Sequence, residues 1–431
     1  MPANQSPRPP ASSLPSHLPT LDGVRAIAVL TVMVMHFTLM QPSGRLEEVL
    51  VRSISGGWAG VDLFFVLSGF LITGILVDAK GGANYFRNFY MRRSLRIFPL
   101  YYGYLALLFI ALPIVVPRTA PDFSGFDRGF WLWTYLSNIQ FARGGWEAMP
   151  PHTTHLWSLA IEEQFYLMWP FVVWMASRKA LLRVCIGAIA SATAARILLH
   201  FLAPDGVAGY ALMPARIDAL ATGGLLAVLV RAPNGVARVA RYARPVAAVA
   251  GAILLGSAVF NAYVHPEDTY FPALAFRTQV VVFPALAAFF GSMLVLAVSA
   301  VPGGRAFRML TAKPMMAIGR YSYALYLLHV PLRDVVRDRL AGGSGLPLVA
   351  GSHIPAQLAL LVVAIGISYV VAFLSWHCYE KHFLSLKRFF EYDRRGATAA
   401  QPAPAPAPRP AAAPPILVSR SSREVEPAAG D

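Results

Sequence analysis

The chain has 431 residues, of which 56% are hydrophobic and only 14% are charged. Soluble globular proteins usually carry about 25% charged residues, so this composition excludes an ordinary soluble enzyme and disfavours one that acts on nucleic acid. The net charge of +15 comes from short basic clusters between apolar runs, which is typical of membrane orientation signals. Cys185 and Cys378 both lie in apolar runs, so the sequence offers neither a disulfide framework nor a cysteine zinc site, and we expect no metal.

Apolar runs of about 20 residues, long enough to cross a bilayer as helices, recur along the chain. Residues 1–20, rich in Pro and Ser, have no signal-peptide pattern and are expected to form a disordered tail. Residues 386–431, with their Pro/Ala repeat, are expected to form a second one. Residues 21–385 are predicted to form an all-α, polytopic membrane helical bundle of about ten transmembrane helices. The candidate spans are 23–41, 58–77, 97–116, 154–176, 182–203, 211–230, 245–264, 278–300, 315–332 and 354–377.

Lysine and arginine are unevenly distributed over the segments that join these spans. If the N-terminus is cytoplasmic, the inner segments carry 25 of them and the outer segments carry 10. The positive-inside rule therefore predicts that both termini are cytoplasmic. The expected location is the cytoplasmic (inner) membrane, with membrane lipids as neighbours.

The first two spans contain ionisable residues, each of which costs several kcal/mol in lipid unless it has a partner or a function. Arg25 and His36 are eleven residues apart, which is about three helical turns, so they share one face about 16 Å apart. Asp62 lies in the outer third of the second span. An anchoring role for Arg25, a packing role for His36 and a neutralising role for Asp62 are the structural alternatives.

The fourth span carries two adjacent carboxylates, Glu162 and Glu163. His155 precedes Glu162 by seven residues on the same helical face, at a depth comparable to that of His36. An imidazole and a carboxylate could meet there as a base and its orienting partner. We expect only one glutamate, preferably Glu162, to face a cavity.

A basic cluster precedes the third span. Arg92 and Arg96 are four residues apart and should face the same way. With Arg93 and Arg25 they predict a cationic mouth on the cytoplasmic side, since the guanidinium fork suits phosphate groups. Contact with anionic lipids is an equally good explanation of the cluster.

Later polar residues are expected to be structural. Arg216 and Asp218 are interpreted as an ion pair, and His329 as an interfacial residue near the outer surface. The spacing of His17 and Asp22 matches a motif of soluble glycerolipid acyltransferases, but we attribute it to chance because it falls before the first span.

Six motifs in a fixed order resemble the acyltransferase-3 family of integral membrane O-acyltransferases, over about residues 20–385. They are LDGVRAIAVLTVMVMHF, GVDLFFVLSGFLIT, YMRRSLRIFPLYY, LWSLAIEEQFYL, RIDALATGG and IGRYSYALYLLH. The resemblance implies ten helices and transfer of an acyl group, commonly acetyl from acetyl-CoA, to a hydroxyl of a carbohydrate or another acceptor. It also assigns functional roles to Arg25, His36, Arg92, Arg93, Arg96, Glu162 and Glu163.

The resulting hypothesis is that acyl-CoA enters from the cytoplasm with its phosphates on the arginines. Its pantetheine arm would then follow the face of the first span that joins Arg25 to His36. His36, oriented by Glu162, Glu163 or Asp62, would remove the proton of the acceptor hydroxyl or carry the acyl group itself. The rival class is a transporter or flippase of a lipid-linked sugar. Acceptor, acyl length and oligomeric state are left open.

Overall fold

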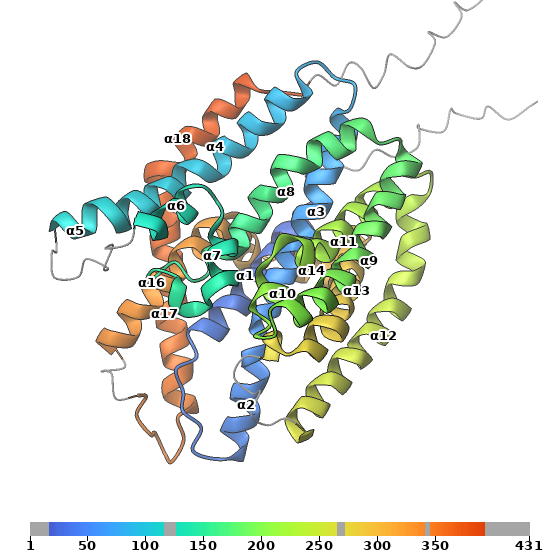
Figure 1. The fold of residues 1–431 in the computed structure, drawn as a ribbon. Coiled ribbons are helices and arrows are strands. Elements are labelled where there is room, and N and C mark those ends of the chain that lie inside the picture. Colours follow the sequence, from blue (N-terminus) through green and yellow to red (C-terminus); the bar gives the residue numbers. More distant parts are fainter. Residues whose placement is uncertain (1–16, 116–125, 265–271, 341–344, 393–431) are drawn as a thin grey trace, which may run out of the picture.

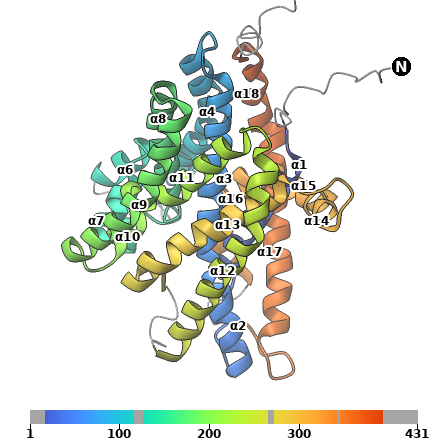
Figure 2. The same ribbon diagram turned by 90° about the vertical axis from the view of Figure 1, so that its right-hand side faces the viewer.

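The computed structural model describes residues 17–115, 126–264, 272–340 and 345–392, which form helices joined by short loops. No named β-strand occurs among them, so the all-α prediction is confirmed. Most of the long helices run between two ends of the molecule (Figures 1 and 2). The first helix begins at Pro19, inside the expected tail. Residues 1–16 and 393–431, the rest of the two expected tails, lie outside the described residues.

Within the described residues, eight helical segments are long and apolar enough to cross a membrane. Their main helices are α1 (Pro19–His36), α3 (Gly60–Ala79), α4 (Tyr85–Ala106), α9 (Arg178–Leu202), α11 (Met213–Val230), α12 (Gly235–Val264), α13 (Phe283–Val298) and α17 (Ile354–Ser375). Shorter helices are α2 (Arg45–Ser55), α5 (Leu112–Val115), α6 (Phe126–Trp133), α7 (Ser137–Gly144), α10 (Val207–Ala211), α14 (Arg305–Leu310), α15 (Lys313–Arg320) and α18 (Lys381–Ser385). Single turns extend several of them: η1 (Gly56–Ala59), η2 (Leu107–Ala111), η4 (Trp146–Ala148), η6 (Pro272–Leu274), η7 (Thr278–Val282), η8 (Trp376–Glu380) and η9 (Leu386–Phe389).

Two of the ten predicted spans are not among these eight segments. They correspond to α8 (Leu156–Met175), with 20 residues, and α16 (Ser322–Leu340), with 19 residues. Both helices are long enough to cross, but α8 contains two adjacent glutamates and α16 carries several charges near its end. The predicted span 315–332 is also divided, because α15 ends at Arg320 and α16 begins at Ser322. Ten crossings therefore stay a prediction.

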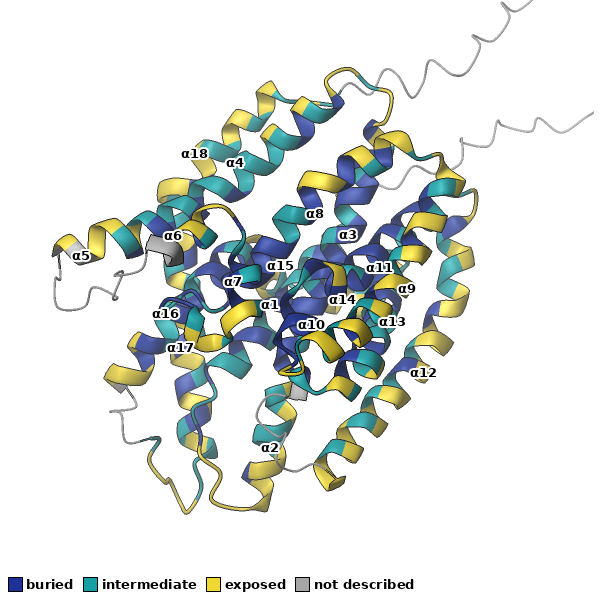
Figure 3. Ribbon diagram, viewed as in Figure 1, coloured by how far each residue is buried: buried dark blue, intermediate teal, exposed yellow. Residues whose placement is uncertain are grey.

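Helices α3 and α11 lie at the centre of the bundle, and α12 lies at its edge. In the apolar 18-residue stretch of each span, buried residues make up 72% for the span that includes α3 and 67% for the span that includes α11, against 6% for α12. Figure 3 shows the same contrast. The two central helices cross closely at glycines: a Cβ on Gly69 would lie 1.9 Å from the Leu220 carbonyl oxygen, and one on Gly223 would lie 2.0 Å from that of Val66. Only glycine fits this crossing.

Buried ion pairs also join the central helices. Arg216 of α11 bonds to Asp62 of α3 at 2.8 Å, and Arg196 of α9 pairs with Asp218 of α11 at 2.8 Å. The predicted pair between Arg216 and Asp218 is therefore wrong, because each residue has its partner on another helix. Residues two apart on a helix do not face each other. The Arg216 guanidinium also lies 4.0 Å from the centre of the Phe283 ring.

Glycines also determine how closely α15 approaches α1. A Cβ on Gly319 would lie 2.0 Å from the Asp22 carbonyl oxygen, and one on Gly23 would lie 2.2 Å from that of Leu310, at the end of α14. The first turns of α1 are thereby held against α14 and α15. This contact fixes the position of Arg25, one turn further along α1.

Candidate active site

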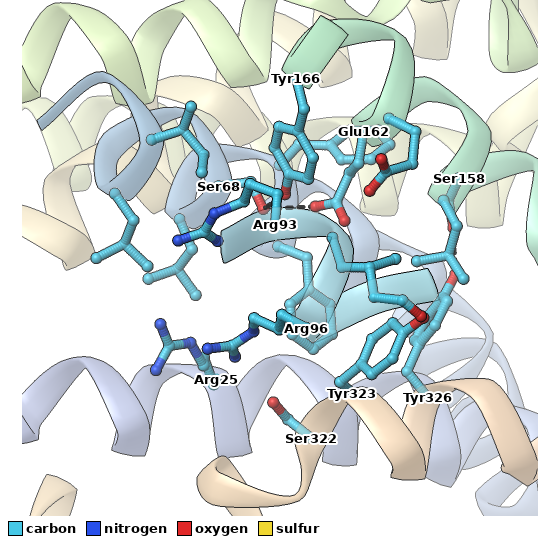
Figure 4. Close-up of a pocket in the computed structure, with 18 of the residues that line it drawn as sticks. Arg25, Ser68, Arg93, Arg96, Ser158, Glu162, Tyr166, Ser322, Tyr323 and Tyr326 are labelled. Atoms are coloured by element: carbon cyan, nitrogen blue, oxygen red, sulfur yellow. Dashed lines mark hydrogen bonds between the residues drawn. The ribbon is translucent and has the colours of Figure 1, made fainter. Parts of the chain in front are cut away.

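A cavity of about 100 Å³, which we call the inner chamber, lies between α1, α3, α4, α8 and α16. Figure 4 shows the guanidinium groups of three arginines on one side of it and the Glu162 carboxylate on the other. Its polar lining consists of Arg25, Ser68, Arg93, Arg96, Ser158, Glu162, Glu163, Tyr166, Ser322, Tyr323 and Tyr326. Five of the eight site residues predicted from the sequence therefore line one cavity.

The arginines of the chamber differ in their partners. Arg25 is paired with Asp22, which also bonds to His17 at 2.9 Å. His17 and Asp22 are thus in contact, although their spacing was attributed to chance. Within the described residues, neither Arg93 nor Arg96 has a carboxylate within 4.0 Å. Partly buried cations without a direct counter-ion are costly, so these two half-buried guanidinium groups suit an anionic ligand.

Arg92 does not line the chamber. Its Nη1 donates to the carbonyl oxygens of Lys387 at 3.1 Å and Phe390 at 3.3 Å, and its guanidinium lies 5.6 Å from the Tyr392 ring centre. The prediction that Arg92 and Arg96 act together on one ligand is therefore not supported by the fold. Arg92 instead fastens the segment after α18 to α4.

A second cavity of about 430 Å³, which we call the vestibule, lies between the start of α1 and α18. Arg25, Arg96 and Tyr323 line both cavities and so form the boundary between them. The vestibule also contains Arg320 and Lys387. Sequence reasoning missed these two cations, because they come from α15 and η9, and only the packing of those elements brings them to the arginine cluster.

Both predicted carboxylates of α8 line the inner chamber, whereas we expected only one to do so. Glu162 accepts a hydrogen bond of 2.5 Å from the Ser68 hydroxyl. Ser68 in turn accepts one of 3.0 Å from the Tyr166 hydroxyl. This chain of hydroxyl groups fixes the orientation of Glu162, while Glu163 has no hydrogen-bond partner among the described residues.

Three imidazoles meet on the far side of the chamber. The Nδ1 atom of His36 lies 3.1 Å from Nε2 of His329, and the His155 and His329 rings are 5.2 Å apart. His329 has an exposed fraction of 0% and so packs inside the bundle, while its predicted depth near the outer surface stays a prediction. His36 and His155 lie at a similar depth, as predicted, but their common neighbour is another histidine.

The chamber ends at a pair of hydroxyl groups just before these imidazoles. Ser158 Oγ and the Tyr326 hydroxyl are 2.5 Å apart, and both residues line the chamber. The Tyr326 ring packs against the rings of His329 and His155, at 5.5 and 5.7 Å. Of the face of α1 that joins Arg25 to His36, only Arg25 lines the chamber. The inner chamber therefore does not extend along this face to His36.

The predicted contact between His36 and a carboxylate is likewise not found among the described residues. Asp62 bonds to Arg216, Glu162 bonds to Ser68, and His36 bonds to His329. The structure thus combines a cationic entrance, a chamber with two carboxylates and a group of imidazoles behind a hydroxyl pair. Within the described residues, no three His, Cys, Asp or Glu side chains are grouped as metal ligands.

Comparison with known proteins gives a family match over most of the chain. Residues 18–373 match the model of a family described as an acyltransferase domain, acyltransferase-3. The peptidoglycan O-acetyltransferase OatA of Listeria monocytogenes is 29% identical over 330 residues, which are 73% of this chain and 49% of that protein. The O-acetyltransferase OatA of Staphylococcus aureus is 27% identical over 337 residues, 74% of this chain and 51% of that protein.

A shorter match has higher identity. The putative peptidoglycan O-acetyltransferase YrhL of Bacillus subtilis is 37% identical over 162 residues, 36% of this chain and 23% of that protein. The chain spans about half the length of the two OatA proteins. No solved structure matches it.

Proposed function

This chain belongs to the acyltransferase-3 family, and on that premise we propose that it is a membrane O-acyltransferase. The donor is an acyl-CoA, most simply acetyl-CoA, bound from the cytoplasm. The acceptor is a hydroxyl group of a carbohydrate at the outer side of the membrane. The similarity to proteins named peptidoglycan O-acetyltransferases supports the acetyl group and the carbohydrate. A transporter or flippase is not favoured by membership of an acyltransferase family.

The observation that supports the proposal is the pair of guanidinium groups, Arg93 and Arg96, that line the chamber and have no direct counter-ion among the described residues. The wide vestibule, with Arg320 and Lys387, suits the charged nucleotide end of acyl-CoA. The chamber is narrow and suits the thin pantetheine arm and the acyl group. Arg25 lies at the boundary and would contact the phosphate nearest the arm.

The carboxylates suit the pantetheine arm for a chemical reason. That arm contains two amide groups, whose N–H groups are donors, and a carboxylate is a strong acceptor. Glu162 is held by Ser68 and Glu163 is without a hydrogen-bond partner in the described part of the chain. We propose that they orient the arm with its thioester toward Ser158 and Tyr326.

In the reaction, the imidazole of His36 removes the proton of the acceptor hydroxyl as its oxygen attacks the thioester carbonyl carbon. A new carbon–oxygen bond forms, the carbon–sulfur bond breaks, and the CoA thiolate leaves. The proton held by His36 then passes to the thiolate, so the products are the ester and free CoA. The hydrogen bond between Ser158 and Tyr326 must open first; a neutral bond of this kind contributes only about 1 kcal/mol.

The proposed topology has ten crossings, with both ends of the bundle at the cytoplasmic side of the inner membrane. The start of α1 and α18 border the same vestibule, which requires an even number of crossings. The positive-inside distribution supports the cytoplasmic assignment of that end.

The function is tested with purified protein in lipid nanodiscs, supplied with acetyl-CoA and peptidoglycan fragments. Free CoA and acetylated fragments are measured together, the latter by mass spectrometry. His36→Ala is expected to lower both by about 10²–10⁴-fold. His200→Ala serves as the matched control, since His200 stacks on Phe276 at the edge of the bundle.

Near-normal product from folded His36→Ala protein would reject His36 as the base. A wild-type protein that forms no acetylated product from any hydroxyl acceptor, yet moves lipid-linked sugar across the membrane, would reject the enzyme in favour of a carrier.

A further inference from the structure

Helix α16 presents two backbone carbonyl groups to the histidine cluster. Pro331 has no N–H group and cannot donate to the carbonyl four residues earlier, that of Leu327. The free Leu327 oxygen accepts a hydrogen bond of 3.0 Å from Nε2 of His155. A proline in α16 thus supplies an anchor for one of the imidazoles.

His329 is anchored by the carbonyl of Tyr326. Its Nδ1 atom lies 2.6 Å from the Tyr326 oxygen. A carbonyl oxygen can only accept, so Nδ1 of His329 must carry a proton. The ring is fully buried, and burial disfavours a charged imidazolium. His329 is therefore neutral, and its Nε2 atom carries a lone pair.

This protonation state determines the direction of the next hydrogen bond. Nε2 of His329 lies 3.1 Å from Nδ1 of His36. Since His329 can only accept at this position, the proton between the rings belongs to Nδ1 of His36. The other ring nitrogen of His36, Nε2, then carries the lone pair.

We infer that His329 is a positioning residue that holds His36 in its Nδ1–H tautomer and so makes Nε2 of His36 the reactive atom. The inference rests on the proposed function, in which His36 acts as the base. The acceptor proton is taken up at Nε2 and passed from there to the CoA thiolate. An acyl-histidine route would likewise form its bond at Nε2.

His329 orients His36 as a carboxylate orients the histidine of a catalytic triad, but the orienting group here is a neutral imidazole. When Nε2 of His36 takes a proton, its Nδ1–H continues to donate to His329. The Nδ1–H group of His329 continues to donate to the Tyr326 carbonyl oxygen. The orientation of His36 thus stays the same through proton uptake and release, although no carboxylate of the described chain contacts it.

The inference is tested by nitrogen NMR on protein labelled with ¹⁵N only in histidine, in nanodiscs and without substrate. The His36 signals are identified by their loss in His36→Gln. We expect wild-type His36 to be protonated at Nδ1. His329→Leu should lose this preference, whereas His329→Gln should keep it, because the glutamine oxygen can also accept. His200→Gln is the control and should leave the His36 signals unchanged.

Kinetics give a second readout that a purely structural role would not produce. His329→Leu is expected to lower kcat by about tenfold, the size of one lost hydrogen bond, with an unchanged KM for acyl-CoA. His329→Gln should recover most of the loss.

A wild-type His36 protonated at Nε2 would overturn the inference, and this result needs no variant to fold. A tautomer that is unchanged in folded His329→Leu would overturn it as well. If instead the tautomer follows the inference while His36→Ala retains activity, the proposed base is wrong and the hydrogen-bond assignment stands.

Discussion

Replacing Asp62 by Asn should destabilise the protein without changing the chemistry of each folded molecule. Sequence reasoning named Asp62 as a group that orients His36, but its carboxylate bonds to Arg216 at 2.8 Å. The two side chains are 2% and 1% exposed. The substitution therefore leaves the Arg216 cation buried without its direct partner.

The magnitude follows from this burial. Removing one partner of a buried ion pair typically costs about 3–5 kcal/mol. At roughly 2 °C per kcal/mol for a large domain, the melting temperature of Asp62→Asn should fall by about 6–10 °C. The double variant Asp62→Asn with Arg216→Met removes both charges, so it should recover most of this loss.

The assay is thermal unfolding of detergent-solubilised protein, followed by loss of the monodisperse peak on size-exclusion chromatography. CoA release per folded molecule is measured on the same samples. An Asp62→Asn protein with an unchanged melting temperature and a large loss of specific activity would refute the structural role. Such a result would support a role for Asp62 in the reaction.

Further predictions concern the arginines and the glycine crossing. Arg96→Gln should weaken CoA binding by about tenfold to a hundredfold, because a charged hydrogen bond contributes about 1.5–3 kcal/mol. Arg92→Gln should weaken it much less, because Arg92 does not line the chamber and contacts the backbone near Lys387. Calorimetric titration with CoA checks both variants, and equal losses would contradict the different roles of the two arginines. Gly69→Ala should destabilise the fold by about 1–3 kcal/mol, because the new methyl group would lie 1.9 Å from the Leu220 carbonyl oxygen. Gly256→Ala meets nothing within 4 Å and should not lower the melting temperature, since alanine favours a helix over glycine. A similar fall in both variants would argue against the close crossing.

The cost of charge inside apolar spans, together with the resemblance to a known family, allowed part of the site to be predicted from the sequence. Arg25, Arg93, Arg96, Glu162 and Glu163 were predicted site residues, and all of them line the inner chamber. Charges inside apolar spans are costly in lipid, so they point toward the interior of a bundle. This argument needs no knowledge of which helices are neighbours.

The partners of these residues could not be predicted in the same way. Spacing shows which side chains share a face of one helix, but tertiary packing decides which helix lies opposite. Hence Asp62 bonds to Arg216 and not to His36, and the partner of His36 is His329. His329 itself looked interfacial, because nothing in the local pattern shows that other helices bury it.

The number of membrane crossings also could not be predicted from apolar content alone. Helix α8 is too polar to qualify by apolar content because it carries Glu162 and Glu163, and α16 because it carries several charged residues near its end. In α8, the glutamates that line the chamber are the residues that lower the apolar content by which spans are identified. The same residues that indicate chemistry thus weaken the evidence for a crossing.

The most direct test of the account is to locate the acyl end of the donor when it is bound. An acyl-CoA with a photoreactive acyl group is bound to the protein in nanodiscs, irradiated, and the labelled peptides are identified by mass spectrometry. The account predicts labelling of the α8 and α16 peptides that contain Ser158 and Tyr326, competed by free CoA and lost in Arg96→Gln. Labelling confined to the lipid-facing helix α12, or labelling at Ser158 and Tyr326 that free CoA does not reduce, would contradict it.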